Sequence, residues 1–95
     1  MNLKIFAIHD IKADLYGPPF YMTTQGEALR AFSDLADDPQ TTVGRHPGDY
    51  RLMLIGEWDN VKGKLQQLEE NVNLGFASDY KAAGNITPLS VKAAS

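Results

Sequence analysis

With 95 residues, the chain predicts a single small domain, and its 9 Lys and Arg against 12 Asp and Glu leave a formal net charge of −3. This acidic balance argues against nonspecific coating of DNA, and the absence of cysteine excludes disulfides and thiol nucleophiles. No apolar run approaches the roughly 18–20 residues of a membrane span, and the first residues lack the apolar stretch of a signal peptide, so we expect a soluble chain that is not exported.

The first expected element is a strand over residues 3–9, where β-branched and aromatic residues follow one another without Gly or Pro. Residues 10–22 contain a Gly-Pro-Pro run, which favours a loop or an edge segment whose aromatic side chains dock on the rest of the domain. Within this segment, residues 20–22 could pair briefly with the sheet.

A helix is expected over residues 25–37, because Thr24 and Glu27 have the spacing of a capping box. In that motif each side chain accepts a hydrogen bond from a backbone N–H at the helix start. Apolar residues recur at three- and four-residue intervals along the segment, which is typical of a helix with one buried face. Pro39 ends the helix. We expect its apolar face to cover one face of a sheet.

The second half of the chain is expected to form a β-hairpin. Residues 38–48 have the composition of a turn, and residues 50–58 form a strand rich in apolar side chains. Residues 59–63 have the composition of a hairpin loop and end in a glycine that can take left-handed backbone angles. Residues 65–70 then return as an antiparallel strand or as a short helix, and we favour the strand.

These elements predict an α+β domain: a small, mostly antiparallel sheet of three to four strands with one amphipathic helix packed on one face. The domain is expected to span residues 1–81. Residues 82–95 are small, polar and without periodicity, so we expect a flexible C-terminal tail.

Both main strands are apolar on two faces, and one helix can cover only one of them. We expect one face to combine Leu3, Ile5 and Ala7 with Leu52 and Leu54, and the other to combine Phe6 and Ile8 with Met53 and Ile55. The loop aromatics Phe20 and Tyr21 could cover the second face. Otherwise this face would expose a larger apolar patch than soluble monomers usually carry, and we therefore expect a homodimer or a higher homo-oligomer.

Two histidines, His9 and His46, lie near strand ends but lack the spacing of metal ligands, so surface or capping positions are expected for them. Asp49 lies three residues from His46, yet no nucleophile, oxyanion hole or phosphate-binding glycine loop accompanies the pair. We therefore expect no enzymatic activity, no metal and no cofactor.

Basic and aromatic residues gather around the second main strand and its hairpin. Single-stranded nucleic acid is held by cationic grooves interleaved with rings that stack on the bases. The residues that we expect to contact nucleic acid in this way are Arg45, Tyr50, Arg51, Trp58, Lys62 and Lys64. The alternative is structural: Tyr50 and Trp58 are in phase with apolar residues of the strand and would belong to the core, while the lysines solvate the hairpin.

Several short motifs follow one another in a distinctive order: Pro19-Phe20, Thr24 with Glu27-Ala28, Arg30-Ala31-Phe32, Asp38-Pro39, His46-Pro47 with Asp49-Tyr50, and Gly56 followed by Asp59. Their order and spacing resemble the small nonstructural protein of gokushovirus-type microviruses, which are tailless phages with circular single-stranded DNA. The resemblance covers about residues 1–80.

The resemblance implies a nonenzymatic viral nonstructural protein that binds DNA, in particular single-stranded DNA, and assists the change from genome replication to single-strand synthesis and packaging. It also implies a location in the cytoplasm of the infected bacterium, away from any membrane. The alternative is an interaction module that contacts a phage or host replication protein without binding DNA. The net charge of −3 and the apolar strand surfaces favour this alternative.

Overall fold

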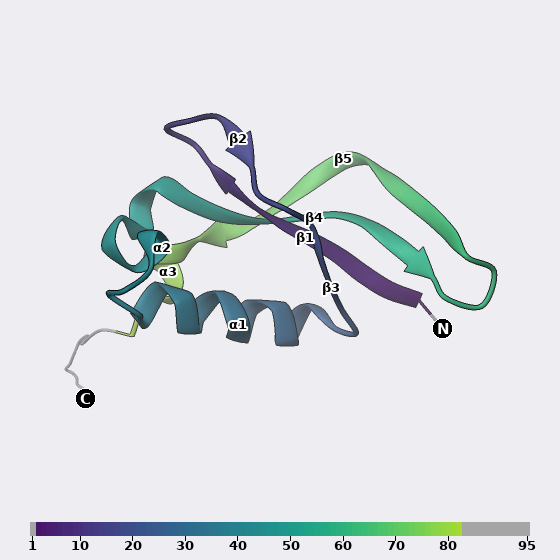
Figure 1. The fold of residues 1–95 in the computed structure, drawn as a ribbon, viewed down its shortest axis with the longest axis horizontal. Coiled ribbons are helices and arrows are strands. Elements are labelled where there is room, and N and C mark those ends of the chain that lie inside the picture. Colours follow the sequence, from purple (N-terminus) through teal and green to yellow (C-terminus); the bar gives the residue numbers. More distant parts are fainter. Residues whose placement is uncertain (1, 83–95) are drawn as a thin grey trace.

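Five strands form one antiparallel sheet, and a long helix packs against one of its faces (Figure 1). The computed structural model describes residues 2–82. The elements in chain order are β1 (Asn2–Asp10), β2 (Leu15–Tyr16), β3 (Phe20–Met22), α1 (Gln25–Asp37), α2 (Thr42–Arg45), the 3₁₀ helix η1 (Pro47–Asp49), β4 (Tyr50–Asp59), β5 (Lys64–Phe76) and α3 (Ala77–Tyr80). The expected α+β class is confirmed, although the sheet has more strands than the three to four expected.

β1 and β4 are the two inner strands of the sheet. β4 pairs with one edge of β1 along its whole length. The other edge of β1 is shared, because β3 pairs with its first half and β2 with its end. The segment expected as a loop or edge therefore contains two short strands, and its Gly-Pro-Pro run separates them. β5 pairs with the remaining edge of β4.

The helix α1 begins where the capping box predicts. Thr24 Oγ1 accepts a hydrogen bond from the backbone N–H of Glu27 at 3.2 Å, and Glu27 Oε1 accepts one from the backbone N–H of Thr24 at 3.1 Å. The helix ends at Asp37, two residues before Pro39. Both ends of α1 thus follow local signals in the sequence.

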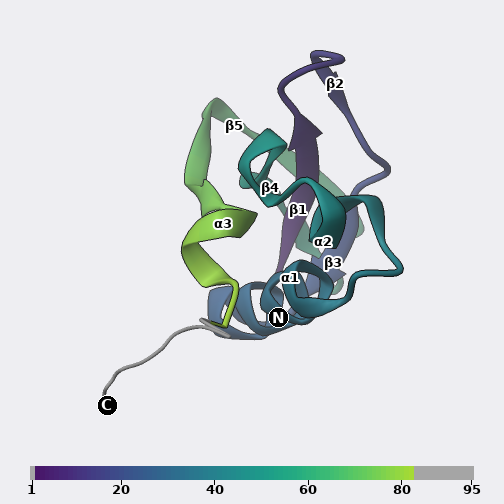
Figure 2. The same ribbon diagram turned by 90° about the vertical axis from the view of Figure 1, so that its left-hand side faces the viewer.

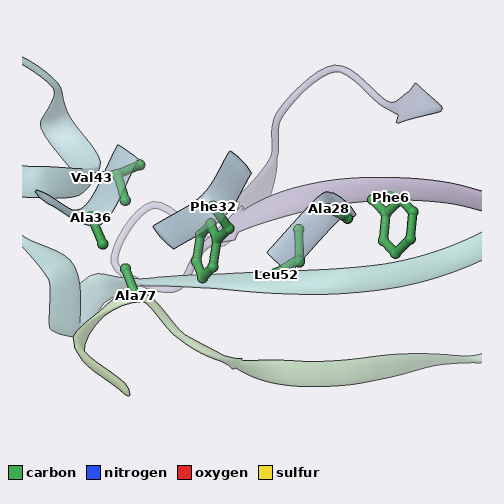
Figure 3. Packing of buried hydrophobic residues seen from close by; sticks show 7 residues of the cluster. All are labelled: Phe6, Ala28, Phe32, Ala36, Val43, Leu52 and Ala77. Atoms are coloured by element: carbon green, nitrogen blue, oxygen red, sulfur yellow. The ribbon is translucent and has the colours of Figure 1, made fainter. Parts of the chain in front are cut away.

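The hydrophobic core lies between α1 and the sheet (Figure 3). Phe6 from β1, Leu52 from β4 and Phe32 from α1 are its largest fully buried side chains. The other buried members of this cluster are Ala28, Ala36, Val43 and Ala77. Small alanine side chains on α1 let the helix lie close to the sheet, so the core remains thin and densely packed.

The register between β1 and β4 decides which side chains face α1. Phe6 lies opposite Leu54, and both pack toward the helix. Ala7 lies opposite Met53, on the other face of the sheet. The expected grouping of Ala7 with Leu54 is therefore wrong. Alternation identifies the two faces of a strand, but it does not say which face of one strand meets which face of its neighbour.

A β-bulge in β4 changes the alternation partway along the strand. Ile5 lies opposite Gly56, and the next pair skips Ile55, which is the extra residue. Beyond the bulge, Trp58 lies on the face away from α1, whereas Tyr50 at the start of the strand packs against the core. The two aromatic residues that share a phase in the sequence therefore lie on opposite faces.

The hairpin between β4 and β5 is confirmed, and Gly63 takes the left-handed backbone conformation, with φ of +66°. The segment 65–70 is part of a strand, as favoured, but β5 is longer than expected. Its pairing with β4 is interrupted at residues 68–71, where β5 bends and arches away from the sheet (Figures 1 and 2). The expected tail lies, apart from Ala82, outside the described residues.

Candidate functional site

The face of the sheet away from α1, called the open face below, is hollowed rather than flat. Ile5 and Ala7 of β1 are buried there. They lie between two walls, one formed by the segment from β2 to β3 and the other by the bent β5. Figure 2, which looks along the sheet, shows α1 on one side and β2 and β5 rising on the other.

The hollow, called the trough below, has two adjoining parts. The larger part has a volume of about 550 Å³ and is lined by Ile5, Ala7, Tyr16, Gly17, Pro19, Tyr21, Ile55, Gly56, Leu65, Gln66, Gln67 and Asn71. The smaller part, of about 340 Å³, is lined by Leu3, Tyr21, Trp58 and Leu65. Tyr21 and Leu65 line both parts, so the two parts adjoin. Its lining is apolar, aromatic and amide in character and contains no Asp, Glu, His, Lys or Arg among the residues named.

Three aromatic side chains line the trough at successive positions along β1. Trp58 lies opposite Leu3, and Tyr21 lies opposite Ile5. Tyr16 lies opposite His9 at the far end. Tyr16 and Tyr21 keep 46% and 44% of their surface exposed, so their rings are available to a ligand.

Only one of the two loop aromatics expected to cover this face does so. Tyr21 forms part of the trough wall. Phe20 packs instead on the α1 side, where its ring stacks on Phe6 with centroids 5.8 Å apart. The neighbouring side chains of Phe20 and Tyr21 on β3 therefore lie on opposite faces of the sheet, as strand alternation requires.

His9 anchors the far end of the trough. It is only 5% exposed, and its Nδ1 accepts a hydrogen bond from Nε of Arg51 at 3.0 Å. Its Nε2 lies 3.0 Å from Oδ1 of Asp14, a residue of the turn before β2 that has a positive φ of 56°. The His9 ring also stacks on Tyr16 with centroids 4.4 Å apart, and Asn71 donates to the Tyr16 hydroxyl at 3.3 Å.

These contacts define the proton arrangement on His9. The guanidinium of Arg51 can only donate, so Nδ1 must be the unprotonated acceptor and Nε2 carries the hydrogen that is donated to Asp14. Arg51, His9 and Asp14 thus form one chain of hydrogen bonds from β4 through β1 to the turn. This chain, together with the stacking contact, holds Tyr16 in place.

The opposite end of the trough borders the β4–β5 turn, which carries Lys62 and Lys64. The Asp59 carboxylate accepts hydrogen bonds from the backbone N–H groups of Val61 and Lys62 at 3.0 and 3.1 Å. These two hydrogen bonds lower the pKa of Asp59 from its ordinary value. Glu57 lies in the same small hollow as both lysines, so the positive charge of the turn is partly balanced.

The structure separates the residues that the sequence predicted as one nucleic-acid site. Trp58, Lys62 and Lys64 lie at the hairpin end of β4, where Trp58 lines the open face. The two lysines line a separate hollow with Glu57 and Asp59, which alternate with Trp58 along the strand and so point to the other face. Tyr50 and Arg51 lie at the other end of the same strand, about 25 Å from Trp58 at the usual rise of a strand. Each group therefore has its own surroundings.

The group at the start of β4 is engaged in contacts within the protein. Tyr50 packs against the core, and burial together with the carboxylate of Asp10 raises the pKa of its hydroxyl. Arg51 is half-buried and donates to His9. Arg45, at the end of α2, is exposed and donates from Nη1 to the backbone carbonyl of Gln40 at 3.2 Å.

Sequence reasoning missed most of the trough. His9 was expected at the surface or as a cap, and its burial contradicts this expectation. Tyr16 and Tyr21 lie in the segment taken as a loop or edge, while Gln67 and Asn71 lie about 50 residues later on β5. The trough forms because the register of several strands brings these segments together, and such pairing leaves little trace in the sequence. The one local signal was the clustering of aromatic residues around the Gly-Pro-Pro run.

Across residues 2–82, no group of three or more His, Cys, Asp or Glu side chains is placed to hold a metal ion. In the same part of the chain, every helix is too short or too polar to cross a membrane.

Comparison with known proteins gives a family for the chain. A search of curated proteins and a search of solved structures find no match. The family model described as Phage ORF5 protein matches residues 3–80, which include every strand and helix from β1 to α3 except the first residue of β1. The chain therefore belongs to the Phage ORF5 protein family.

Proposed function

We propose that this phage protein is a nonenzymatic protein that binds single-stranded DNA in the cytoplasm of the infected bacterium. We further propose, on the resemblance to the microvirus nonstructural protein, that it assists the change from genome replication to single-strand synthesis and packaging. Membership of a phage protein family supports this setting.

The observation that carries the proposal is that Trp58, Lys62 and Lys64 lie at the same end of the sheet, beside the β4–β5 turn. Trp58 lines the open face and the lysines line a separate hollow around the edge, so a strand that passes over this end can contact both. A ring that can stack on a base, beside ammonium groups that can reach phosphates, is the combination by which proteins hold single strands. Tyr50 and Arg51 are removed from this set, because the first packs against the core and the second is bonded to His9. Arg45 is a separate exposed cation that a longer strand could reach.

The experiment is a titration of labelled single-stranded DNA at several salt concentrations. Each phosphate neutralised on a single strand contributes a slope of about −0.7 to the dependence of log affinity on log salt. The double variant with Lys62→Ala and Lys64→Ala is expected to lose about two such contacts. Arg30→Ala, which removes an exposed cation from α1, is the matched control and should leave the slope unchanged. Absence of binding at low salt, or an affinity that does not change with salt concentration, would contradict the proposal.

A second candidate is an interaction module that contacts a phage or host replication protein and does not bind DNA. The observation that favours it is the exposure of apolar side chains, since Leu15, Leu65 and Val61 are 67%, 66% and 77% exposed. A pull-down from infected cells with and without nuclease separates the two candidates. A phage or host replication protein that stays bound after nuclease treatment supports the module, and loss of every partner supports DNA binding.

A further inference from the structure

We propose that the trough on the open face is a base-binding site that takes the nucleobases of a single strand inward and leaves the phosphates outside. This inference rests on the proposed function and adds to it a second set of contacts, away from the lysines of the hairpin. It assigns a role to Tyr16, Tyr21 and the amide side chains of β5.

The first argument is the absence of charge from the lining. None of the residues that line either part of the trough is a Lys, Arg, Asp or Glu. A phosphate placed there would lose water without gaining a cation, which is unfavourable. A neutral planar base loses little hydration and gains contact with the floor around Ile5 and Ala7, so the lining selects bases over phosphates.

The second argument is the spacing of the rings. Trp58, Tyr21 and Tyr16 lie opposite Leu3, Ile5 and His9 of β1, in that order. The first and last positions are six residue steps apart along β1, which corresponds to roughly 20 Å. At about 3.4 Å per stacked nucleotide, this length accommodates up to roughly six nucleotides, near the lower end of known single-strand sites.

The third argument is the fixed position of Tyr16. Its ring is held by the His9 stack, and its hydroxyl accepts a hydrogen bond from Asn71. Ordering these groups before a ligand arrives reduces the entropy lost on binding. Tyr16 is therefore a preorganised stacking surface at the end of the trough far from Trp58.

The fourth argument is the set of amides on the β5 wall. The side chains of Gln67 and Asn71 line the trough and are exposed. A side-chain amide offers both donors and an acceptor, which match the donors and acceptors on the edges of unpaired bases. In a duplex the base faces are stacked and the Watson–Crick edges are paired, so the trough fits single strands and excludes double strands.

The base-inward arrangement also suits the acidic charge of the chain. Affinity supplied by stacking needs few cations, so a net charge of −3 is less of an obstacle than it is for a phosphate-driven binder. Lys62 and Lys64 lie outside the trough at its Trp58 end, where they can contact the backbone of a strand whose bases lie inside.

The test compares two oligonucleotides of equal length, each carrying an uncharged fluorescent label. One consists of thymidine nucleotides, and the other has the same sugar-phosphate backbone but no bases. We measure their affinity for the full chain by fluorescence anisotropy and follow the chain's one tryptophan by its quenching. The strand with bases is expected to bind at least tenfold more tightly and to quench Trp58. A duplex of the same length should bind no better than the strand without bases.

Variants locate the site. Tyr21→Ala and Tyr16→Ala should each weaken binding of the thymidine strand about fivefold or more, the effect of one lost stacking ring. Val72→Ala is the matched control, because Val72 is 44% exposed on β5 but pairs with Leu54 on the α1 side. Thermal unfolding checks that each variant is folded. If one is not, the comparison of the two oligonucleotides on the unaltered chain still decides.

Two results would overturn the inference in distinguishable ways. Equal affinity for the strands with and without bases, with no effect of Tyr21→Ala, would mean that phosphates are bound elsewhere, and the proposed function would stand without the trough. Absence of binding to every nucleic acid, with tight binding of a protein partner, would overturn both the trough and the proposed function.

Discussion

His9 joins three parts of the molecule through contacts on both ring nitrogens and on its ring face. It receives a hydrogen bond from Arg51, contacts Asp14 and stacks on Tyr16. His9 is buried, so loss of its ring would leave the half-buried guanidinium of Arg51 without this acceptor, whereas the Asp14 side chain is 89% exposed and can bind water instead. The residue that looked like a surface histidine in the sequence thus connects β1 and β4 to the turn before β2.

Replacing this histidine tests that connection. His9→Ala removes the acceptor of Arg51 and the partner of Asp14, so we expect the free energy of unfolding to fall by about 1–3 kcal/mol. His46→Ala is the control, since His46 is exposed, and should change stability by less than about 0.5 kcal/mol. Chemical denaturation measures both values. Equal effects of the two substitutions would contradict the role given to His9.

Asp59 makes the stability of the β4–β5 turn depend on pH in the acid range. Two backbone hydrogen bonds favour its carboxylate and lower its pKa, so its contribution to stability is present above the ordinary pKa and is lost as pH falls through the lowered one. Asp59→Asn keeps an acceptor oxygen that does not titrate. We expect the stability of this variant to fall less steeply below about pH 4 than that of the unaltered chain.

Denaturation curves collected from neutral pH to about pH 2.5 measure this effect. Asp34→Asn, an exposed position on α1, serves as the control and should retain the full acid dependence. If the free energy of unfolding of Asp59→Asn falls with decreasing pH as steeply as that of the unaltered chain, the turn does not favour the charged carboxylate.

At the scale of elements, local signals in the sequence specify α1, the two inner strands and the β4–β5 hairpin. The capping box, strand composition and turn glycine act over a few residues, and the structure confirms each of them. What the sequence does not reveal is the pairing between elements. The bulge at Ile55 and the interruption at 68–71 arise from matching strands of different lengths, and no residue pattern within one strand specifies either.

The trough escaped prediction for the same reason. Trp58 was recognised as an aromatic near lysines, but its face depends on the bulge three residues earlier. The partners Tyr21 and Asn71 come from strands on either side of the inner pair. A site of this kind becomes visible only when the register of every strand is known.

The bulge itself can be tested at Gly56. A side-chain Cβ at this position would lie 2.6 Å from the backbone carbonyl oxygen of Gln66, so β5 would have to move away. We expect Gly56→Ala to lower stability by about 1–3 kcal/mol and to weaken single-strand binding by deforming the trough. Gly48→Ala, where a Cβ would meet nothing within 4 Å, is the control. Comparable stability of the two variants would contradict the close approach.

At the scale of the whole molecule, the sheet has an outer edge at β5 that no other strand of residues 2–82 covers. An exposed apolar side chain, Val61, lies in the turn where this edge strand begins. We propose a homodimer or a higher homo-oligomer joined along this edge, because pairing there leaves the trough accessible. Two copies would also bring two troughs to one strand and raise the apparent affinity.

Sedimentation at micromolar concentration measures the oligomeric state. We expect a species of at least twice the chain mass of 10.5 kDa. A single species at the monomer mass would contradict the proposed dimer without affecting the proposed site.

The most direct test of the central claim, that single-stranded DNA binds on the open face, is photocrosslinking. A single strand containing bromodeoxyuridine is irradiated with the full chain, and the crosslinked residues are identified by mass spectrometry. Our account predicts crosslinks at Trp58, Tyr21 or Tyr16, which line the trough. Crosslinks confined to the α1 side of the sheet, such as at Tyr50, or no crosslink at any residue, would contradict it.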